Sequence, residues 1–292
     1  MKEIYNDLPV DKQKEFMKNF FETKSFIQQK FGVDSQNLEE GFYSKQLRNY
    51  FNLTIKKRLN IEFDKLENIH KSVDNQLTSY DFDYGINGLT KALYDMDEEF
   101  ISIYHNFIKN WVDKNIANGR KFWFQHTPTI RVHCPGANSK TVYPAYHNDT
   151  FLGHHPHELN IWVPLTYLED EGHGFTLIGV NESKEILRPY DFDIFKYYAE
   201  VRNHDSKAFK ITDDKAKPVI TEFGEILLFD IRSLHSTMPM YQKTRVSMDI
   251  RIIFDEDKNN HPFAHRGLGR MKTPFEPGEY YYEKAVQNSS FV

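Results

Sequence analysis

The chain has 292 residues, of which 39% are hydrophobic, 15% aromatic and 27% charged, and its formal net charge is −5. With 37 basic against 42 acidic side chains, the composition gives no electrostatic basis for binding nucleic acid or an anionic membrane, so we expect a small-molecule partner. Cys134 is the single cysteine and the N-terminal residues contain no apolar run typical of a signal peptide or membrane span, so we expect a cytoplasmic protein without internal disulfides.

The first 120 residues have the apolar periodicity of helices. One stripe, which Gly32 is suited to end, consists of Phe16, Phe20, Phe21, Ile27 and Phe31. A second stripe follows the acidic residues 97–99 and consists of Phe100, Tyr104, Phe107, Ile108, Trp111 and Val112. Stripes of this kind are typical of core packing, and they predict a helical N-terminal region over residues 1–120.

Beyond Gly119 the pattern changes to short runs of period two with turn residues between them. These predicted strands lie within residues 121–134, 157–168, 174–180, 223–230 and 244–254. Because no helix separates each pair of strands, we expect an antiparallel sandwich or jelly roll, and a single domain that is mainly β with α. Residues 121–256 would form its core, with a helix and loop insertion at about 181–216 and a tail at 257–292 packed on the core.

The segment YPAYHNDTFLGHHPHELNIWVPLT, residues 143–166, holds four of the 13 histidines. His147 and Asp149 are two residues apart, a spacing that places both side chains on one side of a strand. His235, which follows the predicted strand at 223–230 and a short turn, can supply a third ligand. Two histidines and one carboxylate suit mononuclear non-haem Fe(II) and leave three coordination positions open, whereas a closed zinc site needs a fourth protein ligand.

The strand that begins at Arg245 has an unusually polar face. Period two places Arg245, Ser247, Asp249 and Arg251 on that face, and a buried polar face is expected where an anion is held. Arg245 can bind a carboxylate in a bidentate manner while Ser247 donates a further hydrogen bond. Arg251 either helps to bind the anion or forms an ion pair with Asp249. A dicarboxylate could then chelate the metal at one end and be anchored at the other.

This order of motifs resembles the Fe(II)/2-oxoglutarate-dependent dioxygenases. It runs His-x-Asp, an apolar strand, a Gly-Glu strand, His235, and Arg-x-Ser ten residues later. HELNIWVPLT and TRVSMDIR are similar to the phytanoyl-CoA dioxygenase-like group, including its bacterial branch from streptomycin-type biosynthetic clusters. The resemblance covers about residues 122–254.

The resemblance implies a double-stranded β-helix core and the cofactors Fe(II), 2-oxoglutarate and dioxygen. It implies that His147, Asp149 and His235 bind the iron and that Arg245 and Ser247 hold the distal carboxylate of 2-oxoglutarate. Three further residues are substrate candidates: Arg131, Trp162 and His157. Asn160, on the LNIWVP run, is a candidate 2-oxoglutarate contact.

The implied reaction is hydroxylation with release of succinate and CO2. Since the insertion PYDFDIFKYY is acidic and aromatic, we expect it to cover a small polar metabolite such as an amino acid, a sugar or an aminocyclitol.

Three alternatives stay open. His154, His155 and His157 compete as metal ligands, although Pro156 disfavours regular strand geometry there. A cupin-type metal-dependent sugar epimerase or isomerase would share the jelly roll, but such sites usually use three histidines and a glutamate. A non-catalytic jelly-roll binding module would not need the His-Asp-His set. The sequence does not indicate the oligomeric state.

Overall fold

The computed structural model describes residues 10–81, 86–125, 127–136, 145–152, 154–168, 174–257 and 281–283. Helices hold more of these residues than strands do, and the sheets are antiparallel. The protein is therefore an α and β structure in which helix predominates, rather than the mainly β chain that the sequence predicted. Within the described ranges, no helix combines the length and apolar character needed to cross a membrane.

The N-terminal region is mostly helical. Its elements are α1 (Val10–Glu22), α2 (Phe26–Phe31), α3 (Phe42–Leu59), η1 (Leu66–Lys71), α4 (Asn75–Thr78), α5 (Gly88–Leu93), α6 (Glu98–Phe107) and the π-helix η2 (Ile108–Ala117). The first apolar stripe spans two helices rather than one. Ser25 starts α2 with a capping box to Gln28, and Gly32 ends it at φ 72°, as the sequence predicted.

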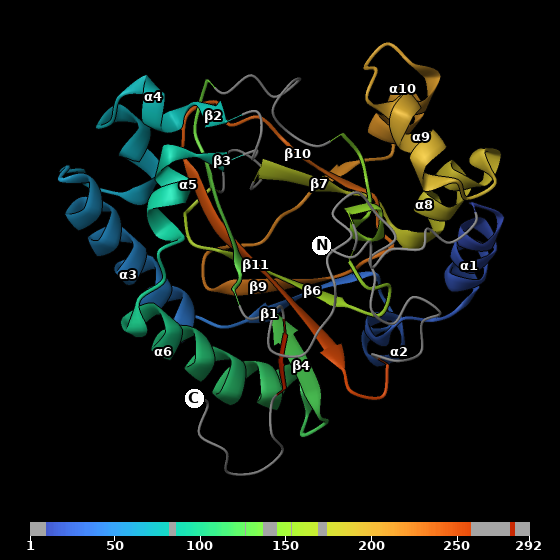
Figure 1. Cartoon of the computed structure of the whole chain (residues 1–292), viewed down its shortest axis with the longest axis horizontal. Coiled ribbons are helices and arrows are strands. Elements are labelled where there is room, and N and C mark those ends of the chain that lie inside the picture. Colours follow the sequence, from blue (N-terminus) through green and yellow to red (C-terminus); the bar gives the residue numbers. More distant parts are fainter. Residues whose placement is uncertain are drawn as a thin grey trace, which may run out of the picture.

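A seven-stranded sheet forms the centre of the molecule (Figure 1). Its order is β1 (Ser35–Glu39), β9 (Glu225–Asp230), β6 (Leu159–Pro164), β11 (Arg245–Phe254), β4 (Phe122–Gln125) and β12 (Tyr281–Glu283), with β5 (Thr129–His133) also pairing with β11. Strand β1 was not anticipated, because it lies inside the region predicted to be helical. Of the predicted tail, residues 258–280 and 284–292 lie outside the described residues.

Two smaller sheets complete the β structure. One consists of β10 (His235–Thr237), β7 (Phe175–Leu177) and β8 (Lys217–Pro218), and the other of β2 (Tyr80–Asp81) and β3 (Ile86–Asn87). All five segments predicted as strands contain strands: β4 and β5 share the first, and β6, β7, β9 and β11 occupy the others.

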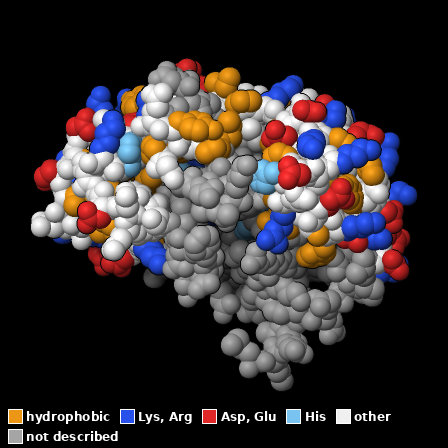
Figure 2. Space-filling model, turned by 90° about the horizontal axis from the view of Figure 1, so that it is seen from above, with side chains coloured by type: hydrophobic (Ala, Val, Ile, Leu, Met, Phe, Trp, Pro, Cys, Tyr) orange, Lys and Arg blue, Asp and Glu red, His pale blue; other side chains and the backbone are white. Residues whose placement is uncertain are grey.

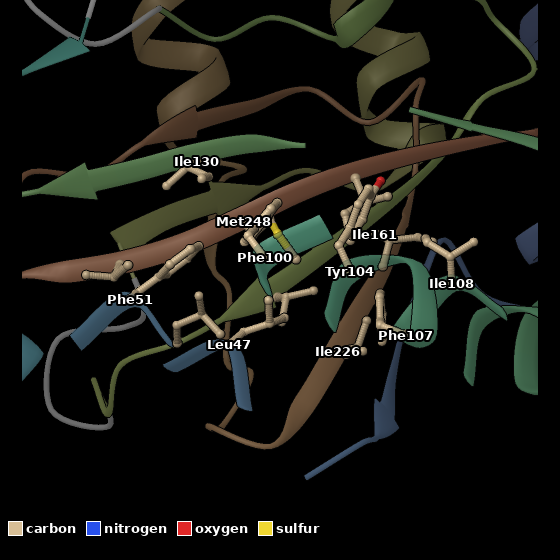
Figure 3. Close-up of a cluster of buried hydrophobic side chains, with 14 of the residues drawn as sticks. Leu47, Phe51, Phe100, Tyr104, Phe107, Ile108, Ile130, Ile161, Ile226 and Met248 are labelled. Carbon is tan, nitrogen blue, oxygen red and sulfur yellow. The ribbon is translucent and has the colours of Figure 1, made fainter. Parts of the chain in front are cut away.

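The two faces of the large sheet have different neighbours. One face meets α3 and α6, and Figure 3 shows Leu47 and Phe100 from these helices beside Met248 of β11. The opposite face meets the small sheet, since the ring of Trp162 on β6 lies 4.8 Å from that of Phe175 on β7. Trp162 is paired with Asp249 in the sheet register, so the polar face of β11 lies on this inner side.

Residues 180–213 form the helices α8 (Val180–Leu187), η5 (Arg188–Tyr190), α9 (Ile194–Val201) and α10 (Lys207–Asp213). They form a second buried cluster with α1, Tyr146 and Leu234. The helices α8, α9 and α10 lie together with α1 at the right of Figure 1. Figure 2 shows basic and acidic side chains interspersed on the described parts of one face, in keeping with the small net charge.

Candidate metal centre

The structure brings His147, Asp149 and His235 together. One ligand atom from each lies within 4.8 Å of the others, and the two imidazole rings are 4.5 Å apart. Reciprocal backbone hydrogen bonds hold the two histidines: His147 N donates to His235 O at 3.1 Å and His235 N donates to His147 O at 2.8 Å. This buried group can therefore hold a metal ion.

The local backbone at His-x-Asp differs from the predicted strand. His147 lies in an isolated β-bridge to His235, and Asp149 begins the 3-10 helix η3 (Asp149–Leu152). The two side chains converge all the same, because the bridge to β10 orients the histidine and the turn that follows directs the carboxylate back toward it. The sequence predicted that His147 and Asp149 converge, and they do, but from a bridge and a 3-10 helix rather than from one strand.

Both histidines present the same ring nitrogen to the centre. The Nδ1 of His147 is 2.7 Å from Ala145 O, and the Nδ1 of His235 is 3.1 Å from Ser233 O. Since a carbonyl oxygen can only accept, each Nδ1 carries the hydrogen and each Nε2 keeps a free lone pair. Such hydrogen bonds fix the tautomer and the ring orientation that metal binding requires.

Two donors act on one oxygen of Asp149. Its Oδ2 accepts from Asn160 Nδ2 at 2.8 Å and from Arg251 Nη2 at 3.1 Å, while Oδ1 lies 3.5 Å from His235 Nε2. Of the two roles that the sequence left open for Arg251, the structure shows an ion pair, but with Asp149, because the long guanidinium side chain reaches across to η3. The contact of Asn160 with a co-substrate stays a prediction.

The surroundings favour the metal-binding forms of Asp149 and His147, whereas the pKa of His235 is raised because the charge of Asp149 and the contact with it outweigh burial. Burial acts to raise the pKa of Asp149, but the charges of Arg251 and His235 outweigh it and hold that pKa well below its usual range. Burial and the neighbouring His235 lower the pKa of His147 to about 3. At neutral pH the group thus offers a carboxylate and a neutral imidazole.

A second polar cluster lies further along the inner face of β11. Arg245 is buried and donates through Nη1 to Gly174 O at 2.6 Å and through Nη2 to His133 Nδ1 at 2.9 Å. Burial and the charge of Arg245 lower the pKa of His133 well below its usual value, so this ring accepts as a neutral imidazole. The sequence did not identify His133 as a partner of Arg245.

The hydroxyl of Ser247 is a buried polar group of this cluster. Its side chain is fully buried, and its Oγ has no hydrogen-bond partner among the described residues. Because Ser247 is two positions from Arg245 on one strand, both side chains face the same interior space.

The three substrate candidates lie in different surroundings. Arg131 pairs with Ser247 in the sheet register, and its Nε lies 4.0 Å from Asp249 Oδ2. Trp162 is buried between the two sheets. The ring of His157 packs edge-on against Phe20 of α1 at 5.6 Å, away from the metal group. Contact of any of them with a substrate stays a prediction.

The histidine-rich run does not join the metal group within the described residues. Instead it surrounds Glu158: His155 N donates to Oε1 at 2.8 Å, and His154 Nδ1 lies 3.1 Å from Oε2. The structure thus separates His154, His155 and His157, which the sequence left open as competing ligands, from the described metal group.

No protein-family model matches the sequence. The streptomycin biosynthesis protein StrG of Streptomyces griseus is 29% identical over 195 residues, which cover 65% of this chain and 73% of that protein.

Among solved structures, the non-haem alpha-ketoglutarate-dependent carbocyclase SnoK from nogalamycin biosynthesis has a TM-score of 0.46 and 10% identity, covering 96% of this chain and 100% of its own. The 2-oxoglutarate complex of a collagen prolyl hydroxylase from Paramecium Bursaria Chlorella virus-1 has a TM-score of 0.37 and 13% identity, covering 76% of this chain and 96% of its own. The chain's own residues form a buried His-Asp-His group that can hold a metal ion.

Proposed function

We propose that this chain is an Fe(II)- and 2-oxoglutarate-dependent oxygenase, built on a double-stranded β-helix core, that hydroxylates a small polar metabolite. The observation that carries the proposal is the buried group of two histidines and one aspartate. Three protein ligands leave three coordination positions for a co-substrate and dioxygen. A cupin-type site of three histidines and a glutamate is less compatible with this ligand set.

The second polar cluster fits the distal carboxylate of 2-oxoglutarate. Ser247 Oγ is a buried hydroxyl without a hydrogen-bond partner among the described residues, and a carboxylate oxygen would accept its hydrogen. Arg245 donates to Gly174 O and to His133, which orient its guanidinium, and it faces the same side of the sheet as Ser247. Hydrogen bonds to a charged group contribute about 1.5 to 3 kcal/mol each, enough to anchor a dicarboxylate.

In the proposed reaction the Nε2 atoms of His147 and His235 and the Oδ1 of Asp149 hold the iron. Arg245 and Ser247 orient the co-substrate, and the packed sheets around them exclude water. When bound, iron and 2-oxoglutarate with dioxygen supply the oxidation of a substrate C–H bond, with release of succinate and CO2. Arg131, Trp162, His157 and Asn160 are the candidates for contacts with the substrate or co-substrate.

One observation bears on the substrate class and another on the segment that covers the substrate. The similar protein StrG is described as a streptomycin biosynthesis protein, which favours a sugar or aminocyclitol. The α8–α9 region also borders the metal group, because Leu187, Ile194 and Tyr197 line a small cavity with His147. We propose that this helical segment covers the substrate.

The test is anaerobic titration of the Fe(II)-loaded protein with 2-oxoglutarate. We expect a weak visible charge-transfer band that Asp149→Ala abolishes. Arg245→Gln should weaken 2-oxoglutarate binding about 10- to 100-fold, the loss of one or two charge-assisted hydrogen bonds. Arg188→Gln, which removes an exposed ion pair with Glu185, is the matched control and should bind normally. No band, or a band indifferent to Arg245, would reject the proposal.

A further inference from the structure

Arg251 lies between two buried carboxylates. Its Nη2 donates to Asp149 Oδ2 at 3.1 Å, and its Nε lies 3.7 Å from Glu158 Oε2. Glu158 is only 4% exposed and belongs to the histidine-rich run, whose described residues do not form part of the metal group. The run is therefore connected to the metal group through Arg251.

We propose that Glu158 is a positioning residue for the metal centre: it orients Arg251 so that the guanidinium holds Asp149 Oδ2 and leaves Oδ1 for the metal. The inference rests on the proposed metal site and is independent of the co-substrate and substrate.

An arginine side chain has many rotamers, and one acceptor does not fix the plane of its guanidinium. Here Nη2 donates a hydrogen bond to Asp149, and Nε lies at ion-pair distance from Glu158 without a hydrogen bond, so the attraction of a second carboxylate favours one orientation of the group. Glu158 is itself held by the backbone N–H of His155 and by the neighbouring ring of His154. The histidine-rich run thus gives Glu158 a fixed position from which to act on Arg251.

The charges support the same conclusion. Without Arg251, the negative charges of Asp149 and Glu158 would be buried near each other with little compensation. Arg251 lies within ion-pair distance of both carboxylates and compensates their charges. Glu158 in turn holds the guanidinium beside Asp149 while lying outside the ligand set.

The arrangement also limits how Asp149 can bind. A carboxylate can chelate a metal through both oxygens, which would occupy one of the positions that a three-ligand site leaves open. Because Asn160 and Arg251 both donate to Oδ2, that oxygen is already engaged. Asp149 would then hold a metal through Oδ1 alone, which would leave three positions open.

Glu67 provides a matched control for a purely structural role. It is 6% exposed, pairs with Arg48 at 2.8 Å and accepts from the backbone of Tyr167 at 2.6 Å. It is therefore a second buried Glu–Arg pair with a backbone donor, but its partners belong to α3 and to the residues after β6.

Co(II) serves as the probe, because its visible spectrum reports on coordination. Relative to wild type, we expect Glu158→Gln to weaken Co(II) binding about 10- to 100-fold, the usual effect of removing a group that orients a metal ligand, and to change the Co(II) absorption spectrum. Glu67→Gln should lower the thermal midpoint and leave the Co(II) affinity and spectrum unchanged. If Glu158→Gln affects only the thermal midpoint, as Glu67→Gln does, the inference is overturned.

Arg251→Lys gives a second measurement should Glu158→Gln not fold. It keeps the positive charge but cannot face both carboxylates through separate nitrogens, so we expect a shifted Co(II) spectrum, and an unchanged spectrum overturns the inference.

His147→Ala separates the two proposals. If wild type binds Co(II) no better than His147→Ala, the proposed function and this inference both fail. If only the Glu158 and Arg251 variants lack an effect, the proposed function survives.

Discussion

Gly174 controls how closely the chain can approach Arg245. Its φ is +85°, its carbonyl accepts from Arg245 Nη1, and an added Cβ would lie 2.9 Å from Arg245 Cδ and 2.9 Å from Met240 Sδ. Glycine is needed here for two reasons, the left-handed backbone and the lack of space for a methyl group. The arginine that we assign to the co-substrate is thus held in part by a residue without a side chain.

Gly174→Ala is expected to destabilise the protein and to weaken 2-oxoglutarate binding. The backbone strain amounts to about 1 to 3 kcal/mol, and the clash adds a displacement of Arg245. Gly119→Ala is the matched control, because its φ is +81° and nothing lies within 4 Å of its Cβ position. Urea denaturation and co-substrate titration of both variants provide the measurement. Equal 2-oxoglutarate affinities in the two variants would contradict the assigned role of Gly174.

At the scale of elements, α1 is attached to the turn that precedes His235. Arg232 is fully buried and donates to Phe20 O at 3.0 Å and to Thr23 O at 2.6 Å, at the C-terminal end of α1. The same guanidinium pairs with Asp230 at 2.7 Å. Carbonyls at a helix end have no partner within the helix, so Arg232 both completes α1 and joins it to the segment that carries a metal-group histidine.

Arg232→Ala is expected to lower the free energy of unfolding by about 3 to 5 kcal/mol, because it leaves Asp230 as a buried charge without its partner. Amide hydrogens of α1 should also exchange faster. Arg188→Ala, which removes an exposed ion pair with Glu185, should lower the free energy of unfolding by no more than about 1 kcal/mol. Chemical denaturation and hydrogen exchange test both effects. A loss no larger than that of Arg188→Ala would show that α1 does not depend on Arg232.

At the scale of the whole molecule, stability should depend on pH through buried histidines. Burial and the charges of Arg245 and Arg131 lower the pKa of His133 well below 6.5. Between that lowered pKa and 6.5 the unfolded chain binds a proton that the folded protein does not. Stability from this residue is therefore complete above about pH 6.5 and is lost as the pH falls, by at most about 1.4 kcal/mol per pH unit.

His133→Gln keeps an acceptor for Arg245 but cannot titrate, so its thermal midpoint should fall less between pH 7 and pH 5 than that of wild type. The raised pKa of His235 acts in the opposite direction, but it is common to both proteins and cancels in the comparison. His204→Gln, on the turn between α9 and α10, is the control. Parallel pH profiles for wild type and His133→Gln would contradict the prediction.

The sequence by itself determined what local periodicity and residue chemistry decide. The alternation along β11 placed Arg245, Ser247 and Arg251 on one face, and Gly32 marked the end of a helix. Residue chemistry made His147, Asp149 and His235 candidate ligands, the family resemblance implied them as the set, and the structure brings them together. These inferences succeeded because each depends on neighbours in the chain or on the types of side chain that bind metals.

Only the tertiary structure decided which groups act on those residues. Several contacts depend on which segments lie side by side. Arg251 and Asn160 donate to Asp149, Glu158 faces Arg251, and His133 accepts from Arg245. Arg251 is 102 residues from Asp149, and no local pattern specifies where so long a side chain ends. Arg251 pairs with Asp149 rather than with Asp249 because of the burial and charge of the folded interior, which form only when the sheets and helices pack.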